Sequence, residues 1–239
     1  MNLHFLFIRI QRQLVRFMPG SCLLCQRPTR HVSGYCRHCI HALPRNISAC
    51  ACCALPLAST SSTYCAHCLH HPRFQGATVP WLYMGDIPSL IHAFKFHAAL
   101  PAATLLAELL GKVFQPQPSS WLLTVPQHPQ RARQRGFDHI DWLASLCPTT
   151  RHLPRIRASR CHNTPPLRHL NRRQRLKLTK NAFELNDSVD EKHIVLLDDV
   201  MTTGATLHSL ARLCYKHGAK SVEVVAIART PPFAWKREA

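Results

Sequence analysis

The sequence predicts an α/β fold in which a mostly parallel sheet is flanked by helices and preceded by a small cysteine-rich module. Residues 194–197 form an unbroken apolar run, which is typical of a parallel strand that is covered on both faces. A helical pattern and a second apolar run at 222–228 follow, and together they make a βαβ unit. Four CxxC pairs precede this domain, so we expect the module over residues 19–75 and the α/β domain over 76–239.

The composition points to an anionic partner. Thirty Lys and Arg residues against twelve Asp and Glu give a formal net charge of +18. No apolar run approaches the roughly 18 residues that a membrane span needs, and the apolar patch at residues 3–8 is too short for a signal sequence. We therefore expect a cytoplasmic protein without a transmembrane segment.

Residues 1–18 predict an amphipathic helix at the start of the chain. Apolar side chains recur there at alternating spacings of four and three, at Leu3, Phe7, Ile10, Leu14 and Phe17. Arginines occupy the rest of the helix surface. Two interpretations stay open, namely packing against the neighbouring module, or a basic amphipathic contact with a membrane or with DNA.

The CxxC pairs predict two structural zinc sites. A pair on a tight turn directs both sulfurs at one tetrahedral ion, and two pairs fill its four positions. Because few large apolar residues stand in this region, metal must supply folding energy that so small a core cannot. Eight thiolates on two Zn²⁺ would lower the formal charge of +18 by four, to +14. The expected ligands are Cys22, Cys25, Cys36 and Cys39 for one site, and Cys50, Cys53, Cys65 and Cys68 for the other.

Three alternatives stay open for this module. The pairs could interleave between the two sites, and a disulfide framework is the alternative without metal, disfavoured because nothing in the sequence indicates export. A ligand could also be replaced by the extra thiol Cys52 or by a nearby histidine, the candidates being His31, His38, His41, His67, His70 and His71.

Between the module and the main sheet we expect two consecutive helices, over residues 89–97 and 102–114, and then a short strand over 121–125. The first helix contains Lys95, which is offered either to solvent or to a ligand, and a solvated lysine is the commoner case.

Basic residues concentrate between residues 126 and 183, where thirteen Lys and Arg stand against two acids, a net charge of +11. One cluster lies in the loop at 125–139, just beyond the carboxyl end of the expected strand, and another surrounds a helix expected over 171–179. Arginine is suited to bidentate contacts with phosphate. The candidates for binding pyrophosphate or a nucleic-acid backbone are Lys95, Arg131, Arg133, Arg135, Arg172 and Arg175.

Residues 193–206, HIVLLDDVMTTGAT, predict the ligand site. Two acids end the central strand, and after a turn a helix opens near Gly204 and stops at Gly218, a good residue after a helix end. Ligands of open α/β sheets bind at the carboxyl ends of strands, where the amides of a helix N-terminus attract phosphate. Carboxylates accept hydrogen bonds from sugar hydroxyls or hold Mg²⁺. The expected site residues are Asp198, Asp199, Val200, Met201, Thr202, Thr203, Gly204, Ala205 and Thr206. The alternative is a strand-end turn with Thr203 as a helix cap.

Four apolar residues, two acids and TTGAT resemble the motif with which type I phosphoribosyltransferases bind phosphoribosyl pyrophosphate (PRPP). The order of parts, with LIHxFKF, an arginine loop ending in RGF and a TPP segment, resembles the ComF/GntX family from about Cys22 to Thr230. The resemblance implies a type I phosphoribosyltransferase-like domain and a role in handling single-stranded DNA taken up from outside. It also implies contact of the acid pair with ribose hydroxyls, and of the following loop with the 5′-phosphate.

The chain departs from the family pattern at several polar positions. Asp138 and His139 stand where the family has Asn-Gln, Leu167 and Arg168 follow the TPP segment, and Leu178 replaces a frequent Asn. These changes remove amide groups that could orient a substrate, and they leave the phosphate loop and the cysteines intact. Phosphate binding therefore carries over better than recognition of a particular nucleophile.

Three functions follow as hypotheses. The first is a protein that handles single-stranded DNA and binds phosphate or PRPP. The second is an active phosphoribosyltransferase with Mg²⁺ and PRPP, for which no catalytic residue is assigned. The third is an adaptor that recruits a helicase or another part of the DNA-uptake machinery. The local charge of +11 exceeds what one small substrate requires, which favours the first hypothesis.

Overall fold

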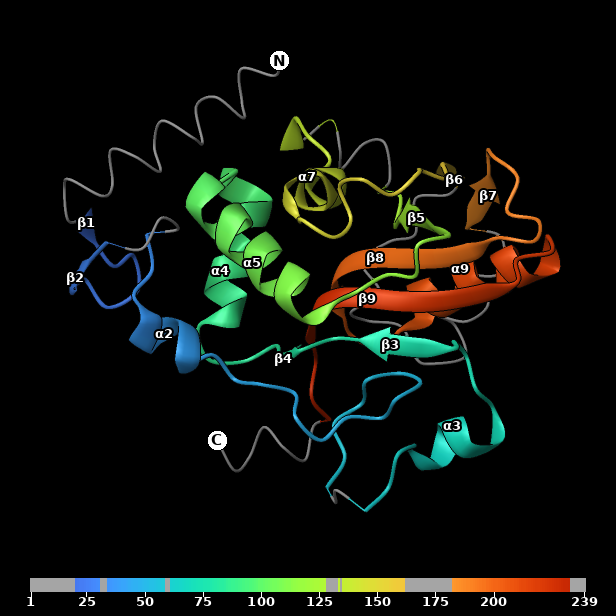
Figure 1. Ribbon diagram of the computed structural model, residues 1–239, viewed down its shortest axis with the longest axis horizontal. Helices are drawn as coiled ribbons and strands as arrows, with labels where there is room; N and C mark the ends of the chain where they lie inside the picture. The colour runs from blue at the N-terminus through green and yellow to red at the C-terminus, as the bar shows by residue number, and fades with distance from the viewer. Residues whose placement is uncertain are drawn as a thin grey trace.

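The computed structural model describes residues 20–30, 34–58, 61–127, 133, 135–161 and 182–232 (Figure 1). The helices expected over residues 1–18 and 171–179 lie outside the described residues. In the described part, no helix is long and apolar enough to span a bilayer.

A parallel sheet forms the centre of the molecule, as predicted. Its strands are β3 (Gly76–Thr78), β4 (Trp81–Leu82), β5 (Ser120–Thr124), β8 (His193–Met201) and β9 (Ser221–Arg229). The order is β3-β9-β8-β5, β4 also pairs with β9, and every pairing is parallel. The expected strands at 121–125 and 222–228 are confirmed, and the two long strands β8 and β9 occupy the middle.

The central strand is longer than predicted. The two acids were expected to end it, but β8 continues through them to Met201. Pairing with β9 persists to the end, with Asp198 opposite Ala226 and Met201 opposite Arg229. The apolar run of β9 offers backbone partners beyond the point where the apolar run of β8 stops, so hydrogen bonding to the neighbour sets the end of the strand.

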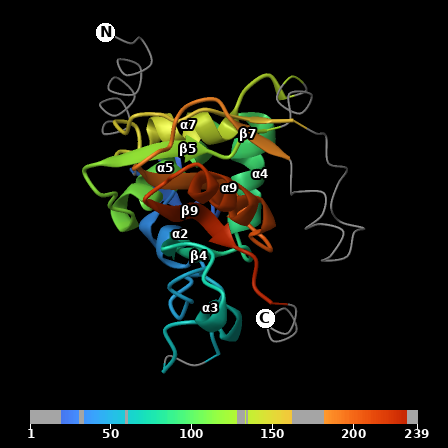
Figure 2. The same ribbon diagram turned by 90° about the vertical axis from the view of Figure 1, so that its right-hand side faces the viewer.

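Helices cover both faces of the sheet. On one face α4 (Ile87–His97), α5 (Leu100–Val113) and α7 (His139–Leu146) pack with Val195 and Leu197 of β8. On the other face α9 (Ala205–Lys216) packs with Ile194 and Leu196 of the same strand. Figures 1 and 2 show α9 behind the sheet in the first view and in front of it after the turn. Successive residues of a strand point to opposite faces, which explains the uninterrupted apolar run.

The helix α9 (Ala205–Lys216) matches the prediction closely. It begins after Gly204 and ends two residues before Gly218, whose φ of +87° is accessible to glycine at little cost. A Cβ at Gly218 would also lie 2.1 Å from Asp190 Oδ1. The predicted apolar stripe is buried, with Leu207, Leu210, Ala211 and Cys214 packed against the sheet.

The smaller elements belong to the cysteine-rich module and to one antiparallel hairpin. β1 (Gly20–Ser21) pairs with β2 (Pro28–Thr29), and β6 (Ala158–Arg160) pairs with β7 (Phe183–Leu185). The short helices α2 (Arg37–His41) and α3 (Ala66–His70) begin within the second CxxC pair of each half of the module, whose first cysteine is the N-cap and whose second cysteine lies in the helix.

The two halves of the module pack on different cores. Around α2, Tyr35 and Leu43 join the core formed by α4 and α5. Around α3, Phe74 and the second set of cysteines join the core formed by α9. The module is therefore integrated with both faces of the α/β domain, and its boundaries at residues 18 and 75 stay predictions.

Candidate functional site

The eight CxxC cysteines form two clusters. In each cluster all four sulfurs lie within 4.8 Å of one another, with Cys25 Sγ 3.6 Å from Cys36 Sγ and Cys53 Sγ 3.8 Å from Cys65 Sγ. A tetrahedral ion with Zn–S distances of about 2.3 Å sets its sulfurs roughly 3.8 Å apart. The clusters therefore fit Zn²⁺ in a closed, structural arrangement.

The grouping of the cysteines answers the alternatives that the sequence left open. Cys22, Cys25, Cys36 and Cys39 make one cluster and Cys50, Cys53, Cys65 and Cys68 the other, so the pairs do not interleave. All twelve cysteines of the chain are described, and all are free thiols, which contradicts a disulfide framework. Cys52 stands outside the second cluster, where its thiol donates to the carbonyl oxygen of Phe74 at 3.3 Å.

Backbone amides favour the thiolate form of Cys22 in the first cluster, whereas burial raises the pKa of Cys39. Cys36 N donates to Cys22 Sγ at 3.3 Å. Burial by itself raises the pKa of Cys22, but hydrogen bonds from the amides of this cluster outweigh burial and lower the pKa to about 6.

A second candidate site is a cavity of about 130 Å³ at the carboxyl ends of β5 and β8. Its charged and polar lining comes from five segments that are distant in sequence. These residues are Lys95, Gln127, Arg135, His139, Arg160, Asp198, Asp199 and Thr206. This is the edge of the sheet at which open α/β folds bind ligands.

Asp199 is buried and fully engaged by the protein. Its Oδ2 accepts from Lys95 Nζ and lies 3.1 Å from His139 Nε2, while its Oδ1 accepts from Val200 N at 2.8 Å. Burial raises the pKa of Asp199, but the hydrogen bond from His139 and the positive charge of Lys95 outweigh it and hold the pKa below its usual range. Asp199 is therefore a carboxylate at neutral pH.

His139 connects Asp199 to the arginine loop. Its Nδ1 is 2.8 Å from Arg135 Nη1 and 2.5 Å from Gln127 Nε2, both of which are donors. Nδ1 must therefore accept, and the ring proton sits on Nε2, which donates to Asp199. Burial is the main reason that the pKa of His139 is lowered, so the ring is neutral. Arg135 also stacks over the Phe96 ring at 5.1 Å.

Asp198 differs from its neighbour in electrostatics. It is half-buried, lines the cavity, and uses Oδ1 to accept from Asp199 N at 2.8 Å. Burial raises the pKa of Asp198, and the negative charge of Asp199 raises it further. The adjacent acids are thus inequivalent, since Asp199 holds the structure together while Asp198 faces the cavity.

The loop before α9 presents backbone amides to the same end of the sheet. Gly204 adopts φ of +70°, a backbone conformation that glycine reaches at little cost, and a Cβ there would lie 2.6 Å from Met201 Cε, so a larger residue would be strained and would displace the end of the methionine side chain. No side chain caps the helix at Gly204, although Thr203 Oγ1 accepts weakly from Ala205 N at 3.4 Å. The amides of the first turn can therefore meet an anion.

Arg229 fixes this loop to the second cysteine cluster. The side chain is buried at the end of β9, where Nη1 donates to the carbonyl oxygens of Met201, at 2.8 Å, and of Thr202. Its Nε donates to the carbonyl oxygen of Cys53 at 3.3 Å. One guanidinium therefore joins the start of the phosphate loop to a residue that belongs to the metal cluster.

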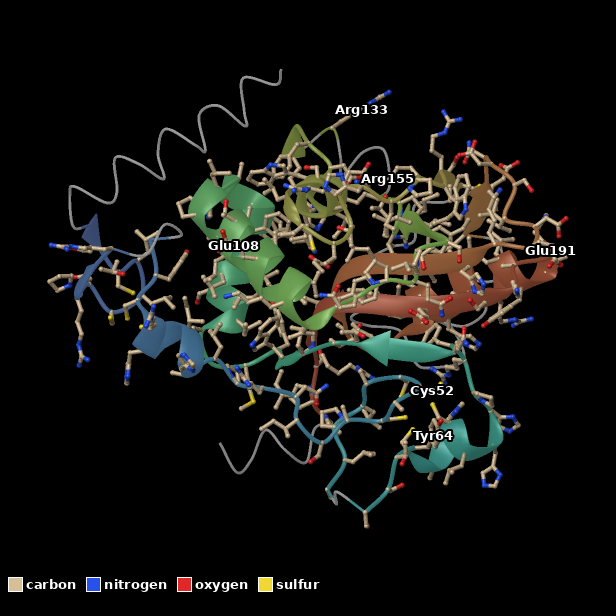
Figure 3. The ribbon with its side chains drawn as sticks, viewed as in Figure 1. Cys52, Tyr64, Glu108, Arg133, Arg155 and Glu191 are labelled. Atoms are coloured by element: carbon tan, nitrogen blue, oxygen red, sulfur yellow. The ribbon has the colours of Figure 1, made fainter. Side chains whose placement is uncertain are left out.

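The structure brings together only some of the predicted basic residues. Lys95 and Arg135 line the cavity, and Lys95 is an ion-pair partner, not a solvated lysine. Arg133 is exposed and extends away from the fold (Figure 3). Arg131, Arg172 and Arg175 lie outside the described residues. Within the acid-threonine string, Met201 is buried under Gly204 and Thr206 lines the cavity.

Sequence analysis missed Gln127, His139 and Arg160 as residues of this site. Gln127 and His139 flank the arginine loop. For His139 the available signal was its departure from the family pattern, in which an amide residue stands at this position. Asp138 and His139, the two residues that depart from the family pattern, both have a role in the structure. Asp138 caps α7, because its Oδ1 accepts a hydrogen bond from Ile140 N at 2.9 Å, and His139 binds Asp199. Arg160 had no such signal.

Comparison with known proteins decides the family. The model of the double zinc ribbon domain matches residues 14–69, and that of the phosphoribosyl transferase domain matches residues 166–233. The chain is 32% identical to the DNA utilization protein YhgH of Salmonella typhimurium, over 89% of this chain and 98% of the relative. The chain belongs to this DNA utilization and competence protein family.

Two further relatives carry competence names. Competence protein F of Haemophilus influenzae is 26% identical over 88% of this chain and 90% of its own length. Competence protein ComFC of Bacillus subtilis is 31% identical over 62% of this chain and 56% of its own length. These matches confirm the resemblance to the ComF/GntX family, and the domain matches confirm the phosphoribosyltransferase-like fold behind a double zinc ribbon.

Replacing Cys53 by Ser is expected to lower the zinc content of this protein from about two ions to about one per chain, because the second structural site loses one of its four ligands. Cys52→Ser is the matched control, since this neighbouring thiol lies outside the cluster and the zinc content should not change. Zinc released from the purified variants is measured by mass spectrometry. Equal zinc loss in both variants would contradict the ligand assignment.

Lys95→Met is expected to destabilise the protein by about 3 kcal/mol at pH 8, because it leaves the Asp199 carboxylate buried with one partner fewer. Burial would then raise the pKa of Asp199 above its unfolded value of about 4. A raised folded-state pKa means that stability recovers as pH falls, so the deficit should shrink between pH 8 and 5.5. Urea unfolding in the presence of zinc measures this trend.

The exposed Lys112 supplies the control for this change. Lys112→Met should alter the free energy of unfolding by less than about 0.5 kcal/mol, without a trend in pH. A deficit of Lys95→Met that is as small as that of the control, or that grows as pH falls, would contradict the assigned ion pair.

Arg229→Met is expected to cost about 2–4 kcal/mol of stability, because the carbonyl oxygens of Cys53 and Thr202 lose the guanidinium donor, while that of Met201 keeps only Thr230 N. Amide hydrogen exchange of residues 200–206 should accelerate, as the loop loses its anchor, while the zinc content stays unchanged. Arg212→Gln, on the exposed face of α9, should leave exchange in this loop as in the parent protein. Unchanged exchange in Arg229→Met would show that the loop is held by other contacts.

Proposed function

We propose that this protein handles single-stranded DNA in the cytoplasm, and that its cavity binds a phosphate or a phosphorylated ribose such as PRPP. One observation carries the proposal. Lys95, Arg135 and Arg160 converge with Asp198 and the N-terminal turn of α9 on one cavity at the carboxyl edge of the sheet. Cations and helix amides suit the phosphate, and the half-buried carboxyl of Asp198 suits the sugar hydroxyls.

The different environments of Asp198 and Asp199 support a sugar ligand. Both oxygens of Asp199 are engaged by the protein, which leaves Asp198 as the acid that can accept hydrogen bonds from a ribose. The raised pKa of Asp198 means that a cation nearby, or a hydroxyl donor, would relieve the repulsion from Asp199. An anion placed against Asp198 would not relieve this repulsion. The phosphate is therefore expected at the N-terminal turn of α9, away from Asp198.

The charge of the whole chain supports a nucleic-acid ligand. Residues 126–183 carry a net charge of +11, and this part of the chain includes Arg135 and Arg160 of the cavity lining. This charge exceeds that of one sugar phosphate. Such a surface would contact the phosphates of a strand, so that affinity falls steeply as salt rises. The relatives that are named DNA utilization and competence proteins fit this interpretation.

An active phosphoribosyltransferase is the second candidate, favoured by the match of residues 166–233 to the phosphoribosyl transferase domain. In that case Asp198 would hold the ribose, or Mg²⁺ together with the pyrophosphate, and the first turn of α9 would bind the 5′-phosphate. The protein would act mainly by positioning and by stabilising charge as pyrophosphate leaves. Release of pyrophosphate from PRPP with a nucleobase added would distinguish an enzyme from a binding protein.

Asp198→Asn is expected to weaken binding of PRPP with Mg²⁺ by about tenfold or more, because an amide binds the ion more weakly than a carboxylate does and offers the sugar hydroxyls one acceptor oxygen fewer. Isothermal titration calorimetry measures this affinity. The control is Asp86→Asn, an exposed acid at the start of α4.

The DNA half of the proposal has a separate measurement. Anisotropy of a fluorescent oligothymidylate should report binding whose logarithmic dissociation constant rises linearly with logarithmic salt. Failure to bind PRPP would remove the sugar-phosphate half. Absent or salt-insensitive binding of the oligonucleotide would remove the DNA half.

A further inference from the structure

A second and larger cavity, of about 580 Å³, lies between the second zinc ribbon and α9. Tyr64, Leu69 and Arg73 of the ribbon and Tyr215 of α9 line it. It shares no lining residue with the cavity at Asp198. Figure 3 shows Cys52 and Tyr64 beside each other at this ribbon. We refer to this cavity as the ribbon groove.

The walls of the ribbon groove expose aromatic and apolar side chains. Tyr64 and Tyr215 are each 43% exposed, and Leu69 is 60% exposed. The hydroxyl of Tyr215 accepts from Val222 N at 3.1 Å, which holds its ring in a fixed orientation. Large apolar side chains exposed around one cavity indicate a ligand surface.

The floor of the groove is rigid. Cys52 and Phe74 are both buried, and the Cys52 thiol donates to the Phe74 carbonyl at 3.3 Å and accepts from Arg73 N at 3.3 Å. This thiol is therefore occupied by structural hydrogen bonds. The groove presents preformed aromatic walls on a fixed base.

The two walls of the groove carry basic side chains and no carboxylate, and the thiol of Cys68 from the second cysteine cluster also lines the groove. Neither residues 64–75 nor α9 contains an acid, whereas together they carry His67, His70, His71, Arg73, His208, Arg212 and Lys216. On α9 the basic residues recur every four positions, so they share one face. That face borders the ribbon, because the His208 and Phe74 rings pack edge to face with their centroids 6.4 Å apart.

The positive charges of Arg73 in the ribbon and Arg212 in α9 both act on the His208 ring. Arg73 Nη2 lies 3.0 Å from His67 Nε2. The pKa of His208 is lowered to about 4, first by burial and then by the positive charges of Arg73, Arg212 and His67. No carboxylate lies in residues 64–75 or in α9 to pair with Arg73 and Arg212, which favours an anionic ligand.

Helix α9 connects the two cavities. Thr206, in its first turn, lines the cavity at Asp198, and Tyr215, in its last turn, lines the ribbon groove. The helix has 12 residues and is thus about 18 Å long. An extended polyanion that lies along the basic face would reach from one cavity to the other.

We propose that the ribbon groove is a second binding site for single-stranded DNA, in which a base stacks on Tyr64 and the backbone phosphates contact Arg73, Arg212 and Lys216. Proteins that bind single strands combine such a basic surface with aromatic side chains on which bases stack. The proposal shares its ligand with the proposed function and rests on it for that choice. The site is new and independent of the cavity at Asp198.

Tyr64→Ala is expected to weaken binding of a fluorescent oligothymidylate about fivefold or more, measured by anisotropy, because one stacking platform is lost. Tyr64→Phe should retain parental affinity, since the ring and not the hydroxyl provides the stacking. Zinc content and PRPP affinity should stay unchanged in both variants, because Cys65 and the cavity at Asp198 are untouched. An equal loss in Tyr64→Phe and Tyr64→Ala would overturn the stacking role.

Arg212→Gln tests the phosphate contacts. It should reduce the slope of logarithmic affinity against logarithmic salt by about 0.7, the value for one phosphate contact on a single strand. Lys112→Gln removes a charge from the end of α5 and should leave the slope unchanged. Photocrosslinking with 5-iodouracil in the oligonucleotide, read by mass spectrometry, should label Tyr64 or Tyr215.

The outcomes separate this proposal from the proposed function. Parental affinity and slope in both Tyr64→Ala and Arg212→Gln would overturn the groove while DNA binding itself stands. The same result would point to a protein ligand for the groove. No binding of the oligonucleotide by the parent protein would remove the DNA role altogether. Tighter binding of oligouridylate than of oligothymidylate would overturn DNA as the ligand.

Discussion

The buried charge of Asp199 is the constraint on which the site depends. An ionised carboxylate inside a protein is tolerated only where partners compensate it. Lys95 reaches it from α4 and His139 from the start of α7, two helices that the chain places on the same face of the sheet. Arg135 and Gln127 then hold His139 from the loop after β5. The walls of the cavity are therefore positioned by the requirement to neutralise one carboxylate.

Local patterns explain how much of the fold was predictable. The apolar runs of β8 and β9, the stripe and flanking glycines of α9, and the spacing of the cysteines are each encoded within a few neighbouring residues. The end of β8 was not predictable, because it depends on pairing with β9. His139 was first interpreted as the loss of an amide group, since its partner Asp199 is sixty residues away. Residues whose role is defined by such distant contacts carry no local signal.

The two halves of the cysteine-rich module are structural parts of the α/β domain. The first packs on the core of α4 and α5, and the second on the core of α9, so that the module contacts both faces of the sheet. Arg229 extends this connection to the phosphate loop, since it donates to Cys53 and to Met201 alike. Zinc bound at the second cluster would therefore contribute to the order of the loop, because the carbonyl that Arg229 needs is fixed only when the ribbon is folded.

The sequence of α9 leaves the N-terminus of the helix without a negative charge of its own. Helices usually place an acid in the first turn, where its negative charge interacts favourably with the helix dipole. Here the first turn contains none, and the helix carries no acid anywhere along its length. An external phosphate can supply the missing negative charge at the N-terminus. Arg212 and Lys216 lie further along the helix, on the face that also carries His208 toward the second ribbon, so α9 places cations beyond its N-terminus as well.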